Sequence, residues 1–207
     1  SASVAVTDKG QNDMPFDKEI DKHTANVGDQ VGYKITSKVP DTKEYTKFTY
    51  KITDTLDNGL TLVDNIKVVI NVPGVGGTEG KTVDLTGNNT IYTKNVNGQT
   101  FTLDFNMKAL TANKEYVGAE LVITYNATVN NNAVAKIEWN NAKLEFTNKG
   151  KIETITDKDY VYTYQLVIDK TDGGSNKLAG AQFALKNSNG DYYHVDEITG
   201  VVTWGDR

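Results

Sequence analysis

The segment LVITYNATV, residues 121–129, decides the fold class. Its apolar side chains fall at every second position: Leu121, Ile123, Tyr125, Ala127 and Val129. Polar residues occupy most of the positions between them. Successive side chains of a β-strand point to opposite faces, so this alternation predicts a strand with one buried face.

The same alternation recurs on both sides of this segment. It appears in residues 31–39, 48–52, 66–72, 101–105 and 142–146. Asn-Gly pairs at 58–59, 97–98 and 189–190 are typical of hairpin turns, and residues 107–117 are the one place where we expect a short helix. Six half-buried strands joined by turns predict an all-β fold, an antiparallel β-sandwich.

The composition excludes several classes of function. Among 207 residues there are 22 Lys and Arg and 27 Asp and Glu, a net charge of −5, which disfavours nucleic acid as a partner and polybasic binding to membranes. No cysteine is present, so disulfides, thiolate metal sites and cysteine nucleophiles are excluded. No apolar run has the length of a membrane span. We expect no metal, no cofactor and no direct insertion into a membrane.

A charged, apolar-poor stretch at residues 147–159 predicts a domain boundary near residue 156. The first domain is then 1–156 and the second 157–207, with a new strand carrying Tyr162, Tyr164, Leu166 and Ile168 on one face. About 50 residues are too few for an ordinary β domain, so we expect a truncated second domain. The start at Ser1 rather than Met similarly suggests a processed or trimmed fragment.

Three polar residues continue apolar faces. Lys18 lies between Phe16 and Ile20, Asp54 follows the alternating run 48–52, and Asn148 follows the run 142–146. Each side chain is therefore expected to point toward the core near a strand end. Burial of an unpaired charge is unfavourable by several kcal/mol, so such groups must become neutral or meet one another.

If the three side chains meet, they form a reactive set. Burial lowers the pKa of a lysine and raises that of a carboxyl group. Neutral Lys18 is then a nucleophile, Asp54 a proton-carrying acid, and Asn148 the acceptor of an intramolecular isopeptide bond, with loss of ammonia. Lys22 is a rival amine and Glu145 a rival acid, although both are expected to face solvent. Spacing alone leaves open the alternative that each polar residue marks a strand end in water.

The second domain repeats the lysine. Lys170 continues the face of Tyr162, Tyr164, Leu166 and Ile168, so it is the candidate amine of that domain. Its acid and asparagine partners are expected beyond residue 207, which predicts an unreacted lysine here. A solvent-reaching lysine at a strand end is the alternative.

Several segments together resemble one known family. They are FDKEI at 16–20, VGDQVGYKIT at 27–36, ITDTLDNGL at 52–60 and NAKLEFTN at 141–148. Their order is similar to that in the middle domain of sortase-assembled backbone pilins of Gram-positive bacteria. VIDKTD at 167–172 and LAGAQF at 178–183 resemble the start of the following collagen-adhesin (Cna) B-type domain.

The resemblance implies an immunoglobulin-like (Cna-type) sandwich with a structural role in a covalent pilus shaft on the cell surface. It implies Lys18 as the amine, Asp54 as the acid and Asn148 as the acceptor of an autocatalytic Lys–Asn bond, without turnover catalysis. The implied partners are other pilin subunits, joined by sortase-linked polymerisation, in an extracellular pilus anchored to the cell wall. The sorting signal and the polymerising lysine motif of the family are not found in this sequence.

An adhesin of similar fold is the alternative function. Loops at 74–80 and 130–132 would then contact a host surface or matrix protein, and saturable binding by the isolated domain would distinguish it from a shaft domain. A turnover enzyme is a weaker alternative, because neither His23 nor His194 has a partner at a spacing typical of a catalytic triad.

Overall fold

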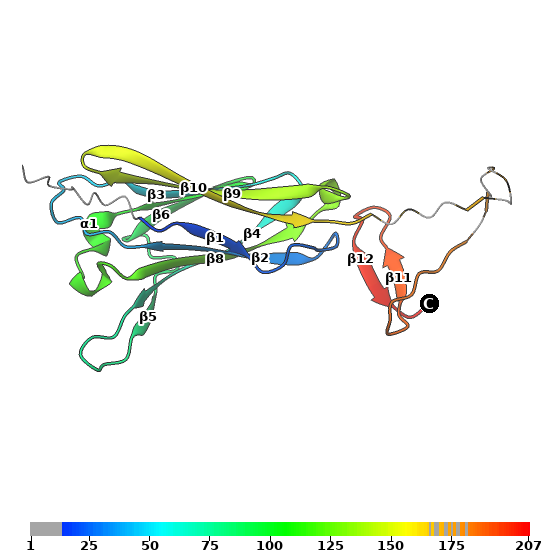
Figure 1. The fold of residues 1–207 in the computed structure, drawn as a ribbon, viewed down its shortest axis with the longest axis horizontal. Helices are drawn as coiled ribbons and strands as arrows, with labels where there is room; N and C mark the ends of the chain where they lie inside the picture. Colours follow the sequence, from blue (N-terminus) through cyan, green and yellow to red (C-terminus); the bar gives the residue numbers. More distant parts are fainter. Residues whose placement is uncertain are drawn as a thin grey trace, which may run out of the picture.

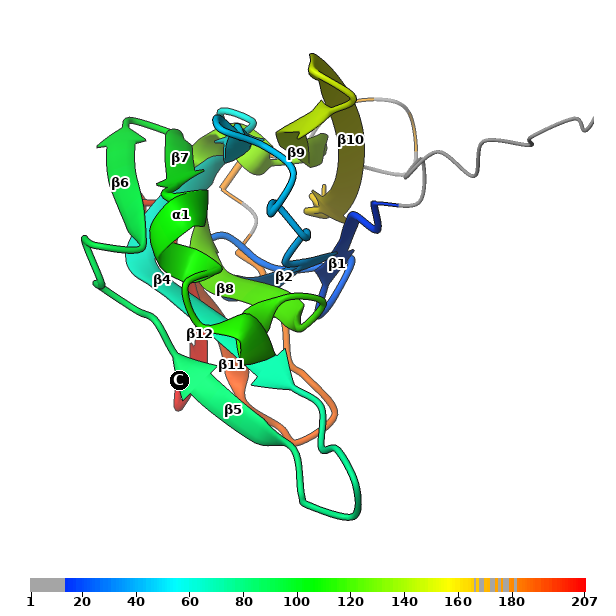
Figure 2. The same cartoon turned by 90° about the vertical axis from the view of Figure 1, so that its left-hand side faces the viewer.

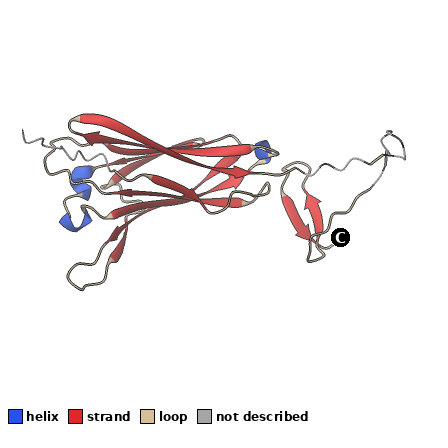
Figure 3. Cartoon of the chain, viewed as in Figure 1, coloured by secondary structure: helices blue, strands red, loops and turns tan. Residues whose placement is uncertain are grey.

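The computed structural model describes residues 14–165, 167, 170–171, 174, 176, 179–180 and 182–207. Strands form nearly all of its regular structure, in two five-stranded sheets and one hairpin (Figure 3). Within this described part, no helix is long and apolar enough to cross a membrane.

Each sheet is antiparallel throughout. The first has the order β1 (Asp17–Ile20), β2 (Gln30–Lys38), β8 (Glu120–Val129), β4 (Leu60–Val72) and β5 (Lys81–Asp84). The second has the order β10 (Lys151–Tyr162), β9 (Ile137–Asn148), β3 (Tyr50–Leu56), β7 (Thr100–Phe105) and β6 (Tyr92–Asn97). The two sheets pack face to face along the long axis of the molecule (Figures 1 and 2). This arrangement confirms the predicted immunoglobulin-like antiparallel sandwich.

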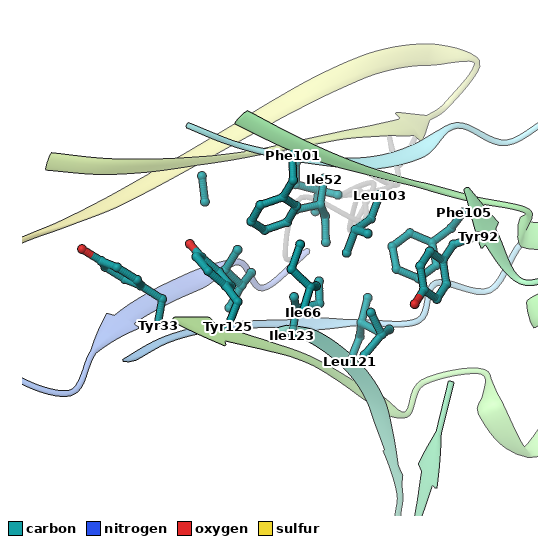
Figure 4. Close-up of a cluster of buried hydrophobic side chains, with 14 of the residues drawn as sticks. Tyr33, Ile52, Ile66, Tyr92, Phe101, Leu103, Phe105, Leu121, Ile123 and Tyr125 are labelled. Atoms are coloured by element: carbon teal, nitrogen blue, oxygen red, sulfur yellow. The ribbon is translucent and has the colours of Figure 1, made fainter. Parts of the chain in front are cut away.

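The core lies between the sheets and follows the predicted alternation. In β8 every second residue from Leu121 to Val129 is buried, because these side chains face the other sheet. Tyr125 meets the ring of Phe101 from β7 edge to face, with 4.9 Å between the ring centres (Figure 4). Side chains from facing strands therefore fill the interior, as two-sheet packing requires.

Two of the predicted turns reverse the chain between segments that pair antiparallel, and one does not. Asn97-Gly98 closes the β6–β7 hairpin, with Gly98 at a φ of +59° that suits glycine. The hairpin prediction for Asn58-Gly59 is wrong, because this pair carries the chain from β3 in one sheet to β4 in the other. The Gly59 N–H donates to the buried Glu138 carboxylate, and glycine suits this position because any Cβ would overlap that side chain.

The connections contain little helix. The helix expected within 107–117 is two short pieces, α1 (Met107–Leu110) and the 3₁₀ turn η1 (Lys114–Tyr116). A further 3₁₀ turn, η2 (Asn131–Ala133), occupies the polar loop at 130–132. Residues 74–80 join β4 to β5 as an exposed loop, as expected.

The predicted boundary at residue 156 falls inside β10. This strand stays paired with β9 as far as Tyr162, which lies opposite Ile137, so the sandwich continues beyond residue 156. Of the strand predicted after it, Tyr162 ends β10, Tyr164 is exposed outside any strand, and Leu166 and Ile168 lie outside the described residues. The division into two domains stays a prediction.

The last described segment forms a hairpin of β11 (Tyr192–Val195) and β12 (Val202–Gly205) beyond the end of β10 (Figure 1). The turn at Asn189-Gly190 precedes it and brings Lys186 opposite Tyr192, as predicted for a hairpin turn. Lys170 is exposed. Its predicted role as an amine of a second domain stays a prediction.

Candidate functional site

Lys18 and Asp54 meet between the two sheets. Lys18 is on β1, opposite Ile35 of β2, and alternation turns its side chain inward. Asp54 is on β3, opposite Ala142 of β9, and also faces inward. Lys18 Nζ lies 2.5 Å from Asp54 Oδ2, and both side chains are fully buried. The structure therefore brings together two of the three residues that the alternation of side chains indicated.

The backbone of β1 is fixed by side chains of β10. Asp157 Oδ2 accepts the Lys18 N–H at 2.7 Å, and Asp159 Oδ2 accepts the Ile20 N–H at 3.0 Å. Two carboxylates at i and i+2 thus bind alternate N–H groups on the outer edge of β1. They replace the missing strand at this edge and hold Lys18 in place. Sequence reasoning missed both aspartates, since their stretch has little apolar content.

Asn140 and Tyr125 complete the buried site. The Tyr125 hydroxyl accepts a hydrogen bond from Lys18 Nζ at 2.5 Å and another from Asn140 Nδ2 at 2.8 Å. Asn140 on β9 is completely buried. The two nitrogens are therefore within two hydrogen-bond lengths of each other, joined by one hydroxyl oxygen.

Two tyrosine rings line the site beside the lysine. Lys18 Nζ lies 4.7 Å from the ring centre of Tyr33 and 5.2 Å from that of Tyr125. The two rings stack with 5.5 Å between their centres and rise from β2 and β8 toward the opposite sheet (Figure 4). These rings exclude water and lower the local dielectric constant, so electrostatic effects at the site are strong.

Burial shifts both ionisable groups toward their neutral forms. It lowers the pKa of Lys18 below its ordinary value, and the attraction of Asp54 opposes this shift only in part. Burial also raises the pKa of Asp54, again against the opposing effect of Lys18. Among the described residues, Asp54 Oδ1 and Asn140 Oδ1 are buried with no hydrogen-bond partner. A protonated Asp54 carboxyl group could donate a hydrogen bond, and Asn140 Oδ1 could accept one.

Asn148, the predicted acceptor, lies elsewhere. It is buried at the end of β9, where its Nδ2 donates to Glu153 Oε1 at 3.0 Å. Asp54 faces Ala142, so Asn148 is roughly 20 Å further along the strand at the usual rise per residue. Asn140 is one inward position from Ala142 in the other direction. The structure brings Asn140, and not Asn148, to the Lys18–Asp54 pair.

The rival residues do not enter the site. Lys22 is exposed, and Glu145 pairs with Lys143 at 3.2 Å. The ring of His23 stacks on Tyr160, and His194 Nε2 lies 2.7 Å from the carbonyl oxygen of Asp206. In the part of the chain that is described, no three His, Asp or Glu side chains gather as metal ligands do.

The fold and the buried site define a class of protein: an immunoglobulin-like sandwich domain whose paired ionisable groups, Lys18 and Asp54, lie inside the core rather than in an open cleft. Residues 27–150 match the family model of the Gram-positive pilin backbone subunit 2, Cna-B-like domain. The chain belongs to this family.

Known proteins similar to the chain agree with this assignment. The trypsin-resistant surface T6 protein of Streptococcus pyogenes serotype M6 is 27% identical over 191 residues, covering 81% of this chain and 34% of that protein. The chain therefore spans about a third of that relative. The group B streptococcus pilus 2b backbone protein has a similar fold, with a TM-score of 0.69, 24% identity, and 92% and 72% of the two chains covered. For BcpA, the major pilin subunit of Bacillus cereus, the TM-score is 0.57 with 24% identity, covering 93% and 53%.

Proposed function

We propose that the chain is a structural domain of a pilus shaft and locks itself with an isopeptide bond between Lys18 and Asn140, assisted by Asp54. One observation carries this proposal. Lys18 Nζ is 2.5 Å from a fully buried carboxylate, and one hydroxyl connects it to a fully buried asparagine amide. Asn140 replaces Asn148 as the acceptor because it is the asparagine that shares the site.

The reaction is an acyl transfer. Neutral Lys18 Nζ attacks Cγ of Asn140, a C–N bond forms, and the carbonyl oxygen takes up negative charge. Protonated Asp54 stabilises this oxygen by donating a hydrogen bond. The tetrahedral carbon then expels Nδ2 as ammonia, after one proton has passed from the former amine to that nitrogen. An amine and a primary amide become a secondary amide and ammonia, so no oxidant or cofactor is needed.

The folded sandwich would favour the reaction in two ways: it places the amine near the amide, and it buries an ion pair at a cost in free energy. An unreactive carboxamide reacts at a useful rate only when the nucleophile is held against it, and packing on β1 and β9 does this. A buried ion pair also costs free energy that its mutual attraction does not fully return. The reaction consumes the amine as a neutral amide, so it removes a charged group from the core.

The role in assembly follows from the family. We propose that the chain is joined to other pilin subunits by sortase-linked polymerisation, in an extracellular pilus anchored to the cell wall. The alternative of an adhesin is not favoured. Asn130, in one of the two candidate contact loops, uses its Nδ2 to bind Asn58 O and Thr61 Oγ1 within the sandwich. Its side chain thus serves the fold.

Intact mass under denaturing conditions tests the bond. The wild-type chain is expected to be lighter than its calculated mass by about 17 Da, the ammonia lost in acyl transfer. Asn140→Ala and Asp54→Ala are expected to have full mass. Asn148→Ala is the matched control, since it removes a buried asparagine from the same strand and should keep the deficit.

Two results of this measurement would contradict the proposal in different ways. A wild-type chain of full mass would remove the isopeptide bond from the proposed function. A deficit that survives Asn140→Ala and disappears in Asn148→Ala would assign the acceptor to Asn148. Fragmentation of the cross-linked peptide locates the bond directly.

The rate of bond formation should depend on pH as a broad bell. The reactive pair carries one shared proton, either as an ion pair or as neutral amine and neutral acid, so the rate is level across the middle range. Acid adds a second proton and blocks the amine, and base removes the shared proton and with it the acid. Because the pKa of Asp54 is raised and that of Lys18 is lowered, both limbs of the pH–rate profile should lie between pH 3.8 and 10.5.

The profile can be measured on newly made chains. The chain is produced by brief cell-free translation and diluted into buffers of different pH, and its intact mass is followed over time. A rate that rises steadily to pH 11 would exclude a role for protonated Asp54.

A further inference from the structure

The Tyr125 hydroxyl occupies a position that packing alone does not explain. Its oxygen contacts both nitrogens of the proposed reaction, the attacking Lys18 Nζ at 2.5 Å and the departing Asn140 Nδ2 at 2.8 Å. Side chains around it seal the site, because Lys18 is 4% exposed and Asp54 and Asn140 are not exposed at all. The buried groups that contact the leaving nitrogen are therefore the ones placed to supply its proton.

We propose that Tyr125 is a catalytic residue of bond formation: its hydroxyl carries a proton from Lys18 Nζ to Asn140 Nδ2. This inference rests on the proposed isopeptide reaction and identifies the group that moves a proton between its two nitrogens. In the resting amide, Nδ2 donates to the hydroxyl oxygen. After attack, Nδ2 becomes tetrahedral and gains a lone pair, so the same contact can reverse and the hydroxyl can donate.

The transfer balances in one exchange. The attacking nitrogen, now bonded to Cγ, carries a positive charge and one proton too many. It gives that proton to the Tyr125 oxygen while the hydroxyl proton moves to Nδ2. Ammonia leaves with the electrons of the Cγ–Nδ2 bond, and Tyr125 ends as it began. A general acid–base group placed in this way contributes a rate factor of roughly 10²–10⁴.

A second carrier is useful because Asp54 has another task. Asp54 Oδ2 accepts a hydrogen bond from the amine, and Asp54 Oδ1, which is buried without a partner, is the group available to the carbonyl oxygen of Asn140. The Tyr125 hydroxyl is well suited to stay protonated until it is needed, since burial and the neighbouring Asp54 raise its pKa well above the ordinary value. In this scheme Asp54 acts on the carbonyl oxygen of Asn140, and Tyr125 acts on its Nδ2.

Tyr125→Phe separates the hydroxyl from the ring. The phenylalanine ring would keep the stacking with Tyr33 and the edge contact with Phe101, so the sandwich should still fold. The matched control is Tyr50→Phe. Tyr50 is also fully buried and its hydroxyl is hydrogen-bonded, to Ser37 Oγ at 2.7 Å and Lys38 O at 3.1 Å, but it contacts none of the reacting groups.

The experiment follows the mass of newly made chains. Wild type, Tyr125→Phe and Tyr50→Phe are produced by brief cell-free translation, diluted into buffer near pH 7, and sampled for intact mass and for thermal unfolding. Tyr125→Phe is expected to lose ammonia at least about tenfold more slowly than wild type while approaching the same final mass. Tyr50→Phe is expected to react at the wild-type rate. The unreacted forms of both variants should show similar losses of stability, so the rate alone distinguishes a catalytic hydroxyl from a structural one.

The outcomes separate this inference from the proposed function. Equal rates for Tyr125→Phe and wild type overturn the proton relay and leave the isopeptide bond standing. Equal slowing in Tyr125→Phe and Tyr50→Phe also overturns it, because a general loss of packing then explains the rate. A wild-type chain that never loses ammonia overturns the proposed bond and the relay together.

Discussion

Asn140→Ala is expected to unfold about 10–20 °C below the wild-type chain. A bond from Lys18 to Asn140 closes a loop of more than a hundred residues, and the chain-entropy relation for cross-links gives about 5 kcal/mol for such a loop. In a domain of this size, each kcal/mol moves the melting temperature by about 2–4 °C. Calorimetry on the two purified chains measures the difference.

Asn148→Ala separates the cross-link from the loss of a buried amide. Both variants remove an asparagine from the inward face of β9, but only Asn140 lies beside Lys18. A fall of at most a few degrees is expected for Asn148→Ala, since its cross-link remains. Equal melting temperatures for the two variants would show that the bond does not carry the stability.

Asp54→Ala should be more damaging still, and a second substitution should repair part of the damage. Without Asp54 the cross-link does not form, and Lys18 stays in the core without its 2.5 Å carboxylate partner. Removal of one partner of a buried ion pair costs about 3–5 kcal/mol. Adding Lys18→Met replaces the unpaired amine by an apolar side chain of similar length. The double variant should therefore be more stable than Asp54→Ala alone, although neither has the bond.

The pH dependence of these two variants provides the control. In Asp54→Ala, burial lowers the pKa of Lys18 in the folded state, so the unfolded chain binds the proton more readily. Stability should then be lowest below the folded-state pKa of Lys18 and should recover as the pH rises toward 10.5. The variant that also carries Lys18→Met should lack this recovery. Denaturant titrations at several pH values compare the two, and identical pH profiles would contradict an unpaired buried amine.

The alternation of side chains predicted which face of its strand each candidate site residue occupies, but not where along the strand it meets its neighbours. Residues 140, 142, 144, 146 and 148 all share one face of β9, so Asn140 and Asn148 fit the alternation equally well. The choice between them depends on register, because Asp54 lies opposite Ala142. Register is a property of the paired strands and leaves no mark in either strand's own pattern. The inward orientation of Lys18 and Asp54 was predictable because few inward positions of their short strands are polar.

The sandwich was predictable from the alternation of apolar and polar residues, but its last strand, β10, was not. β10 is mostly exposed, with charged residues such as Glu153, Asp157 and Lys158 along it, so it lacks the apolar face by which the other strands were recognised. Charged side chains suit a sheet edge because they discourage pairing with other chains. The stretch therefore resembled a linker, although it pairs with β9 along its whole length and holds β1 through Asp157. Tyr125 was seen only as a core residue because alternation reports burial and not the contacts of a hydroxyl group.

The two ends of the proposed bond lie on strands that the chain reaches first and nearly last. Lys18 is on β1, while Asn140 is on β9, directly before β10 in the sequence. In a shaft under tension, force would enter through β1, pass through the Lys18 side chain to Asn140, and leave through β9 and β10. The strands from β2 to β8 would lie outside this path and bear no load. Roughly 400 Å of extended chain would thus stay folded while the fibre is pulled, so the subunit would behave as a link of fixed length rather than as a spring.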